Sequence, residues 1–96
     1  MQTTGATVPV KSIKACVVYD VTRGRIHHQH RVLTLVGGRE PADDEIARDA
    51  LQALNRRRKP PKGKLQVLHI KHDAMEQGKR YRVDLKTKKL AIAKAG

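Results

Sequence analysis

The chain of 96 residues contains no tryptophan and no phenylalanine, and its only aromatic residues besides histidine are Tyr19 and Tyr81. A hydrophobic core must therefore be built from Ile, Leu, Val and Ala, and such a core is modest enough for partner binding or dimerisation to help hold it. The shortage of aromatic rings disfavours nucleic-acid binding by a mechanism that stacks bases, as RRM or OB-like domains do. If nucleic acid binds, we expect mainly phosphate contacts with weak sequence specificity.

Cysteine and long apolar runs are equally scarce. Cys16 is the only cysteine, so it cannot form an intrachain disulfide, and a lone thiol fits a reducing compartment. The longest uninterrupted apolar run, residues 15–19, is far shorter than the roughly 20 residues of a transmembrane helix. No secretory signal pattern opens the chain. We therefore predict no membrane span and a cytoplasmic location.

Motifs that carry catalysis or hold cofactors are also missing. The sequence has no Cys-x-x-Cys, no His-Glu-x-x-His, no Gly-x-Ser-x-Gly, no P-loop and no glycine-rich dinucleotide fingerprint. We accordingly predict a non-enzymatic protein that holds no cofactor.

Positive charge is abundant and unevenly placed. Residues 1–55 carry seven Lys and Arg against six Asp and Glu, whereas residues 56–96 carry fourteen against three, so that +11 of the net charge of +12 lies in the second part. Such an asymmetry suggests a polyanionic partner, because crowded like charges repel one another unless a partner relieves them.

The densest run of cations is RRRKPPKGK, residues 56–64, where six of nine positions are Lys or Arg on a connection stiffened by two prolines. Exposure and density are what contact with phosphate requires. The predicted polyanion-binding residues are Arg56, Arg57, Arg58, Lys59, Lys62 and Lys64, helped by Arg80 and Arg82. Two other interpretations stay open: the cations only complement a helix end and keep the protein in solution, or they meet an acidic protein or a membrane surface.

Apolar periodicity predicts the secondary structure. Four segments have the alternation or the β-branched content of strands. We predict these strands at residues 13–21, 25–35, 65–72 and 81–85. Residues 41–58 favour a helix, because apolar side chains recur at helical spacing, acidic residues stand at the start and arginines at the end. A short fifth strand over residues 90–93 is left open.

These elements predict an α+β fold: one small domain in ββαββ order, with a mainly antiparallel four-stranded sheet and one helix packed on one face. The domain is expected to cover residues 12–93, between flexible ends at residues 1–11 and 94–96.

A weak internal echo links two predicted hairpins. The stretch YDVTRGRI, residues 19–26, resembles VDLKTKKL, residues 83–90, in its Asp, its loop and its apolar restart. Gly24 suits a positive φ in the first loop. Lys88 stands at the same place in the second, where a positive φ would be strained by roughly 1 kcal/mol.

Three histidines, His27, His28 and His30, follow the first loop. If Asp20 and Arg25 close the hairpin, the expected cross-strand pairs are Tyr19 with Ile26, Val17 with His28, Ala15 with His30 and Ile13 with Val32. Cys16 would then pair with Gln29 on the opposite face, away from both imidazoles, which argues against a Cys–His nucleophile. A bulge near Val32, or apolar burial on both sides of the strand, would explain why Leu33 and Leu35 fall out of phase.

The same histidines are weak candidates for a metal site. His28 and His30 at i and i+2 share one strand face, and His69 or His72 could supply a third ligand. The simpler interpretation is that the imidazoles are hydrogen-bonded or partly wet at the rim of the helix-covered face, or lie under a partner. Metal binding is therefore not predicted.

Two hypotheses of function follow from the sequence. The leading one is a small basic module that docks nucleic acid or a nucleoprotein through phosphate contacts. The alternative is a protein assembly module, such as a homodimer, in which His28, His30 and sheet-edge residues form the interface. A His-based metal-binding protein is the third and weakest.

Overall fold

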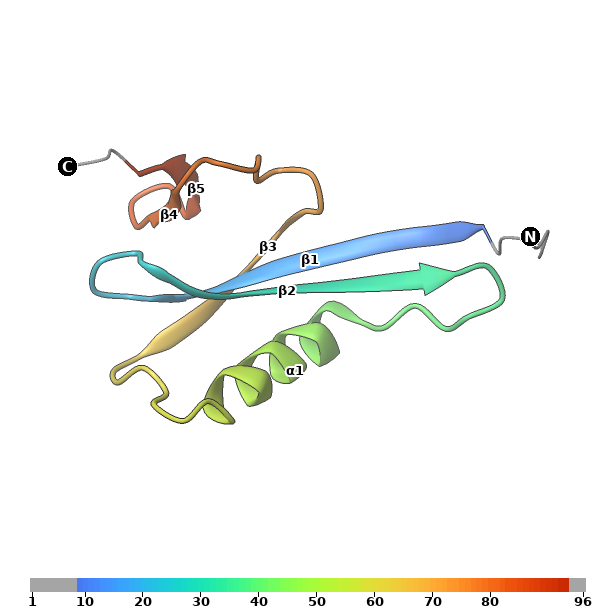
Figure 1. Cartoon of the computed structure of the whole chain (residues 1–96), viewed down its shortest axis with the longest axis horizontal. Helices are drawn as coiled ribbons and strands as arrows, with labels where there is room; N and C mark the ends of the chain where they lie inside the picture. Colours follow the sequence, from blue (N-terminus) through green and yellow to red (C-terminus); the bar gives the residue numbers. More distant parts are fainter. Residues whose placement is uncertain (1–8, 94–96) are drawn as a thin grey trace.

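A computed structural model describes residues 9–93 of the chain (Figure 1). The fold is α+β, and its elements follow in the predicted ββαββ order with the short fifth strand added. They are β1 (Val10–Asp20), β2 (Ile26–Leu35), α1 (Asp43–Asn55), β3 (Leu65–Lys71), β4 (Tyr81–Asp84) and β5 (Lys89–Ile92).

The predicted four-stranded sheet is wrong in one respect. The strands form a three-stranded antiparallel sheet in the order β2-β1-β3 and a separate two-stranded sheet of β4 and β5. A single bridge between Arg25 and Arg82 links β4 to the start of β2. The chain after β3 crosses to the other face of the three-stranded sheet, so β4 pairs with its neighbour in sequence and covers that sheet instead of extending it.

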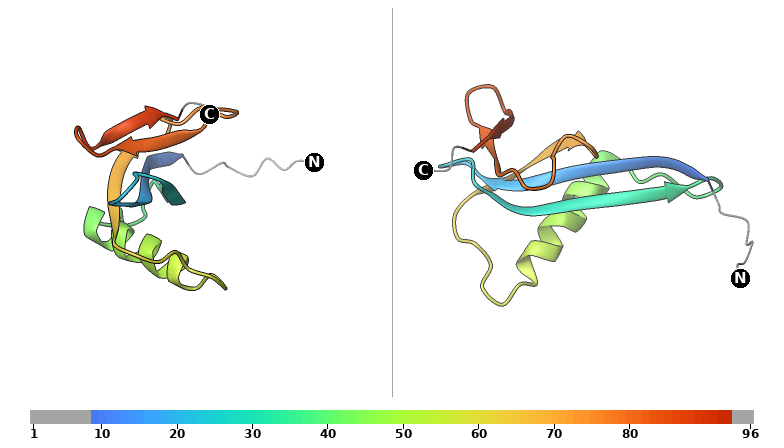
Figure 2. Two further views of the ribbon diagram at one scale, coloured as in Figure 1. Left: turned by 90° about the vertical axis from the view of Figure 1, so that its left-hand side faces the viewer. Right: turned by 45° about the horizontal axis from the view of Figure 1, so that its top comes forward.

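Both faces of the three-stranded sheet are therefore covered, by α1 on one side and by the β4–β5 hairpin on the other (Figure 2). This arrangement explains the apolar run at residues 15–19, all buried in the central strand β1. The helix side of the core contains Cys16, Val18, Ile46, Ala50 and Leu54. The hairpin side contains Val17, Tyr19 and Val83. One helix with one stripe of apolar side chains can bury only one sheet face, and the second core layer explains why β1 is apolar on both.

The register of the β1–β2 hairpin agrees with the prediction at its closed end and then departs from it. Tyr19 pairs with Ile26 as expected, but an irregularity follows at once and His27 has no partner on β1. The next pairs are Val18 with His28, Cys16 with His30 and Lys14 with Val32. Because one extra residue exchanges the two faces of a strand, His28 and His30 lie on the helix side, together with Cys16.

The bulge is thus at His27 and not near Val32; a second register shift lies between Val10 and Ser12. The predicted wetter face of β1, with Lys14, Cys16 and Val18, is in fact the face that packs on the helix.

The helix begins at Asp43, two residues after Pro41, and ends at Asn55 with Arg56 as its C-cap. Its first turn contains Asp43, Asp44 and Glu45, which meet the positive end of the helix dipole as predicted. Arg39 forms an ion pair with Glu45, and Lys14 of β1 approaches Asp43 to 3.1 Å. The Lys14 contact connects the start of the helix to β1, and the Arg39 pair connects it to the preceding loop.

The molecule is elongated, 48 × 27 × 26 Å along its principal axes. The β1–β2 ribbon accounts for the length, because it extends beyond both the helix and the β4–β5 hairpin (Figure 1). β1 begins at Val10, inside the segment expected to be a flexible end. Residues 1–8 and 94–96 lie outside the described residues, so flexibility there stays a prediction. Across residues 9–93 no helix has the length and apolar character needed to span a membrane.

Candidate nucleic-acid interface

The β1–β2 turn presents two arginines, Arg23 and Arg25, on either side of a buried glycine. The amide of Gly24 donates to the carbonyl of Asp20, and the amide of Asp20 donates to the carbonyl of Arg25, both over 3.0 Å. The Asp20 carboxylate accepts the amide of Arg23 at 2.6 Å. Gly24 has a φ of +74°, which a side chain would strain. The turn is thus closed by backbone bonds, while both guanidinium groups stay exposed.

The same turn is hydrogen-bonded to two segments that are distant in sequence. On the helix side, the amide of Val21 donates to the carbonyl of Lys64 over 3.2 Å. On the hairpin side, the amide of Val83 donates to the carbonyl of Gly24 over 2.8 Å, beside the bridge between Arg25 and Arg82. Cation-bearing segments from three parts of the chain are therefore held at one end of the molecule by their backbones.

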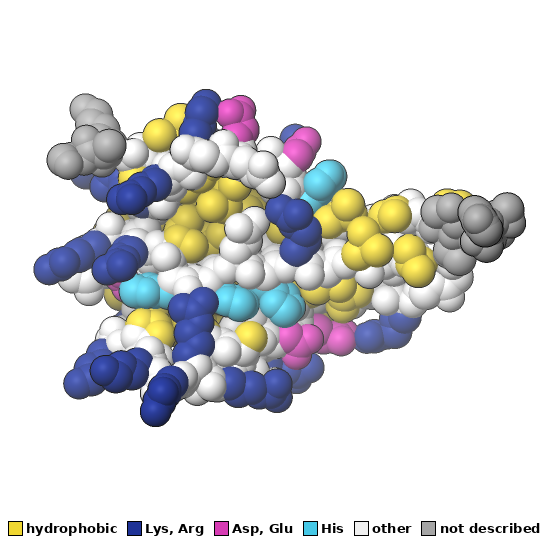
Figure 3. Space-filling view, in the orientation of Figure 1, with side chains coloured by type: hydrophobic (Ala, Val, Ile, Leu, Met, Phe, Trp, Pro, Cys, Tyr) yellow, Lys and Arg dark blue, Asp and Glu magenta, His cyan; other side chains and the backbone are white. Residues whose placement is uncertain are grey.

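We call this region the basic end. Its residues are Arg23, Arg25, Lys62, Lys64, Arg80, Arg82 and Lys86, all exposed. Figure 3 shows Lys and Arg side chains gathered toward this end of the molecule, at the left. Within residues 9–93 none of the seven forms an ion pair with an Asp or Glu. The carboxylate of Asp84 accepts the amides of Lys86 and Thr87 in its own turn; these bonds, together with the charges of Arg82 and Lys86, lower its pKa.

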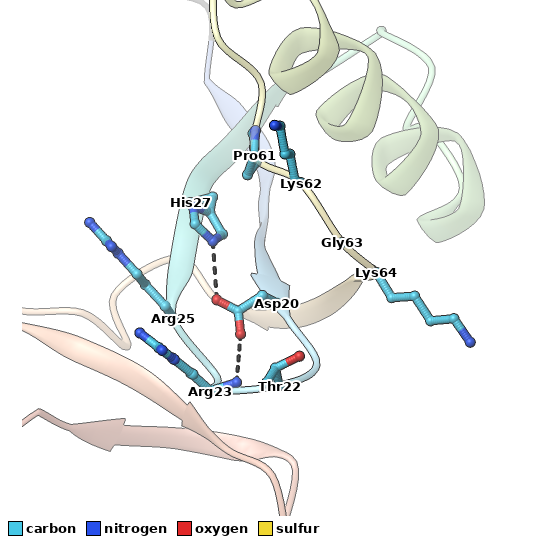
Figure 4. A pocket seen from close by; sticks show the side chains of 9 residues that line it. All are labelled: Asp20, Thr22, Arg23, Arg25, His27, Pro61, Lys62, Gly63 and Lys64. Atoms are coloured by element: carbon cyan, nitrogen blue, oxygen red, sulfur yellow. Dashed lines mark hydrogen bonds and ion pairs between the residues drawn. The ribbon is translucent and has the colours of Figure 1, made fainter.

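A hollow of about 300 Å³ lies on the helix side of the turn, between the turn and the loop before β3. Figure 4 shows the imidazole of His27 directed at Asp20, whose other oxygen faces the amide of Arg23. The His27 Nε2 to Asp20 Oδ2 distance is 3.1 Å. Burial alone would raise the pKa of Asp20, but the Arg23 amide and the His27 imidazole outweigh it and the pKa is lowered. Lys62 and Lys64 line the outer part of this hollow.

A second hollow, of about 460 Å³, lies on the hairpin side of the turn. Four arginines line it: Arg23, Arg25, Arg80 and Arg82. Its remaining lining is apolar or aromatic and consists of Ile26, Met75, Tyr81 and Ala93. No Asp or Glu takes part, so its positive charge is not neutralised from within.

The structure brings together four of the eight predicted polyanion-binding residues. Lys62 and Lys64 lie on one side of the β1–β2 turn, and Arg80 and Arg82 on the other. The remaining four are exposed after the helix and line neither hollow: Arg56, Arg57, Arg58 and Lys59.

Arg57 turns back over β2, with its Nη2 atom 3.4 Å from His28 Nδ1. Arg23 and Arg25 were not predicted from the sequence. An Arg-Gly-Arg sequence at a tight turn nevertheless indicates two exposed cations, because the arginines flank a glycine whose position cannot hold a side chain.

The histidines do not assemble into a metal site. The ring centroids of His28 and His30 are 5.8 Å apart, and His69 lies on β3, separated from them by Cys16 of β1. Across residues 9–93 no three His, Cys, Asp or Glu side chains gather as metal ligands. Nε2 of His28 is buried without a hydrogen-bond partner. Burial, then the charges of Arg57 and His30, lower the pKa of His28, which favours a neutral ring.

The predicted separation of Cys16 from the imidazoles is wrong: Cys16 pairs with His30 on one side and with His69 on the other. A different property disfavours this role. Cys16 is fully buried, and burial raises the pKa of its thiol to about 11. The thiolate, which is the nucleophilic form, is therefore scarce at neutral pH.

Comparison of the chain with protein-family models, with curated proteins and with solved structures gives no significant match.

Proposed function

We propose that this protein is a non-enzymatic module that binds nucleic acid through its basic end. The observation that carries the proposal is the convergence of seven exposed cations from three distant segments, without an ion-pair partner among residues 9–93, around a turn fixed by backbone hydrogen bonds. Cations that serve only solubility can be scattered over the surface, and they do not require backbone hydrogen bonds that hold three segments together. A strand of phosphates supplies repeating negative charge for cations that have no ion-pair partner among residues 9–93.

The contacts expected are mainly electrostatic. Each phosphate that is neutralised releases condensed counterions, so affinity should fall steeply with salt. If about five phosphates are contacted, the slope of log K against log salt concentration should be roughly −3 to −5. An acidic protein has no regular phosphate spacing, and its affinity should depend less steeply on salt.

The first test is a titration of the purified protein into labelled DNA and RNA at several salt concentrations, with heparin as competitor. The decisive variant is Arg23→Glu/Arg25→Glu, which reverses two exposed charges in the turn. Its matched control is Lys11→Glu/Lys71→Glu, which makes the same change of charge at exposed positions outside the basic end. We expect the turn variant to lose at least 10-fold in affinity and the control to change it much less.

Equal losses in the two variants would mean that net charge, and not the basic end, attracts the polyanion. A further double reversal at Arg57 and Arg58 separates the cations after the helix from the basic end. If binding depends on that pair and not on the turn, the site lies on the connection after α1 instead.

A second candidate function, self-assembly, is favoured by the opposite end of the molecule. Four apolar side chains are exposed where the β1–β2 ribbon projects, and we call this segment the apolar arm. They are Val10, Leu33, Leu35 and Val36, with Leu33 and Val36 more than half exposed. Figure 3 shows hydrophobic side chains along this narrow extension. Exposed apolar side chains close together often mark an interface.

The partner we propose for the arm is a second copy of the chain. β2 is an outer strand of the sheet, and a twofold arrangement would let two such edges pair with each other. Two cations near the arm are paired within the chain, Lys14 with Glu40 and Arg39 with Glu45, which lowers the repulsion between two copies. Sedimentation should then show a dimer that tolerates high salt and dissociates in Leu33→Lys. His28 and His30 lie on the same strand but are half-buried on the helix side, apart from the side chains of the apolar arm.

A further inference from the structure

We infer that the hollow on the hairpin side of the turn binds one unpaired nucleotide of a nucleic-acid strand, with the base on its apolar floor and the adjoining phosphates on its arginines. This inference rests on the proposed function and makes it specific: it names the form of nucleic acid that the basic end selects.

The composition of the hollow is the first argument. Arg23, Arg25, Arg80 and Arg82 line it together with an apolar floor that includes Ile26, Met75 and the ring of Tyr81. A bare phosphate would make no contact with the apolar floor, and an apolar ligand would leave the four arginines without a partner. A nucleotide carries both a flat, weakly polar base and a phosphate. Figure 3 shows hydrophobic side chains exposed between the β4–β5 hairpin and the β1–β2 ribbon, with cations to the left.

Size is the second argument. The hollow has a volume of about 460 Å³, within the roughly 300–1,000 Å³ of sites for small ligands. A base paired within a duplex could not enter it without leaving its stack, whereas the base of a single strand is free to turn in.

Rigid placement is the third argument. Val83, next to Arg82 in β4, donates to the carbonyl of Gly24, which lies between Arg23 and Arg25. The amide of Glu76 donates to the Tyr81 hydroxyl over 2.8 Å, which ties the loop carrying Met75 to the ring. Rim and floor are thus organised before a ligand arrives, and this reduces the entropy lost on binding.

Tyr81 is the one aromatic ring that lines this hollow. Tyr19 is buried in the core, with its hydroxyl bonded to Gln66. Arginine planes also stack on bases, so the guanidinium groups can contribute to base contact as well as to charge. A site with a single ring should take a single base, and the rest of the strand should be held by phosphate contacts alone.

The test compares two single-stranded oligonucleotides of equal length, one with all bases and one in which every nucleotide is abasic. Both carry the same phosphates, so any difference in affinity reports base contact. We expect the abasic strand to bind roughly 5- to 100-fold more weakly, the effect of one stacked base. Equal affinities for the two strands would overturn this inference and leave nucleic-acid binding by the basic end intact. If neither strand binds, the proposed function fails as well.

Variants assign the effect to the hollow. Tyr81→Phe keeps the ring, whereas Tyr81→Leu removes it, and both lose the hydroxyl that holds the loop. We expect the preference for the base-bearing strand to survive in Tyr81→Phe and to shrink in Tyr81→Leu. A preference that persists unchanged in Tyr81→Leu would contradict the assignment of the base to this floor.

The arginines have a matched control one residue away. Arg80→Gln should weaken binding of both strands, because it removes a cation from the rim. Lys79→Gln removes a neighbouring cation that is paired with Glu76 and does not line the hollow, so its effect should be smaller. Equal effects at the two positions would contradict a defined rim of arginines.

Discussion

The amide of Val83 donates a 2.8 Å hydrogen bond to the carbonyl of Gly24, and this contact joins the β1–β2 turn to β4. The approach leaves no room for a side chain, because a Cβ atom at position 24 would collide with the carbonyl oxygen of Val83. Gly24 therefore has two independent reasons to be glycine: a positive φ and a close backbone neighbour.

Gly24→Ala should lower the free energy of unfolding by about 3 kcal/mol, because it adds a backbone collision to the strain of a positive φ. Gly37→Ala is the matched control: φ is also positive there, at +90°, but nothing lies within 4 Å of the added Cβ. It should cost only about 1 kcal/mol. Chemical denaturation measures both, and equal losses would show that the turn can move away from β4.

Lys88→Gly should stabilise the protein. Lys88, which stands at the position of Gly24 in the internal echo, has a φ of 56°, and it is the only non-glycine residue with positive φ among residues 9–93. Relief of that strain should exceed the entropy cost of glycine and raise the free energy of unfolding by roughly 0.5 kcal/mol. Lys86→Gly removes the same charge in the same turn without relieving strain, and it should not stabilise.

His28 should make the protein less stable in mild acid. The pKa of His28 is lowered in the folded state, so as pH falls below about 6.5 the unfolded chain takes up a proton that the folded chain resists. The free energy of unfolding should therefore decline as the pH falls from about 6.5 to the pKa that His28 has in the folded protein. The decline should be smaller in His28→Leu, and denaturation at several pH values measures it. His72→Leu, an exposed position, is the control. An unchanged decline in His28→Leu would exclude this ring as the cause.

Cys16 should resist thiol reagents in the folded protein. Its thiol is fully buried and its pKa is raised to about 11, so labelling at pH 8 should follow the rate of unfolding. Stability should also fall between about pH 9 and pH 11, because the unfolded thiol ionises there while the folded one stays neutral. Rapid, stoichiometric labelling of the folded protein at pH 8 would contradict this account.

Local patterns in the sequence predicted most of the elements. The helix stripe, the four strands and the turn at Gly24 follow from periodicity and turn chemistry, and these depend on near neighbours alone. The alternation of β1 could not reveal that both of its faces are covered. That outcome depends on where the β4–β5 hairpin packs, a contact between segments more than 60 residues apart.

The register and the site were harder to predict for related reasons. A single unpaired residue at His27 moves His28 and His30 to the other face, and nothing in the composition of that stretch marks it. Charge density pointed to the run at residues 56–64, yet only its end reaches the basic end. Arg23 and Arg25 are sparse in sequence and become prominent only because backbone hydrogen bonds bring other cations beside them.

The long axis of 48 Å has cations at one extremity and exposed apolar side chains at the other. If several copies bind side by side along one polyanion through their basic ends, their apolar arms all point away from it and lie in one thin layer. Such confinement raises the local concentration of the tips into the range that weak pairing requires. The polyanion would then act as a template for assembly. The length of the polyanion, more than the total protein concentration, would determine when the apolar arms associate.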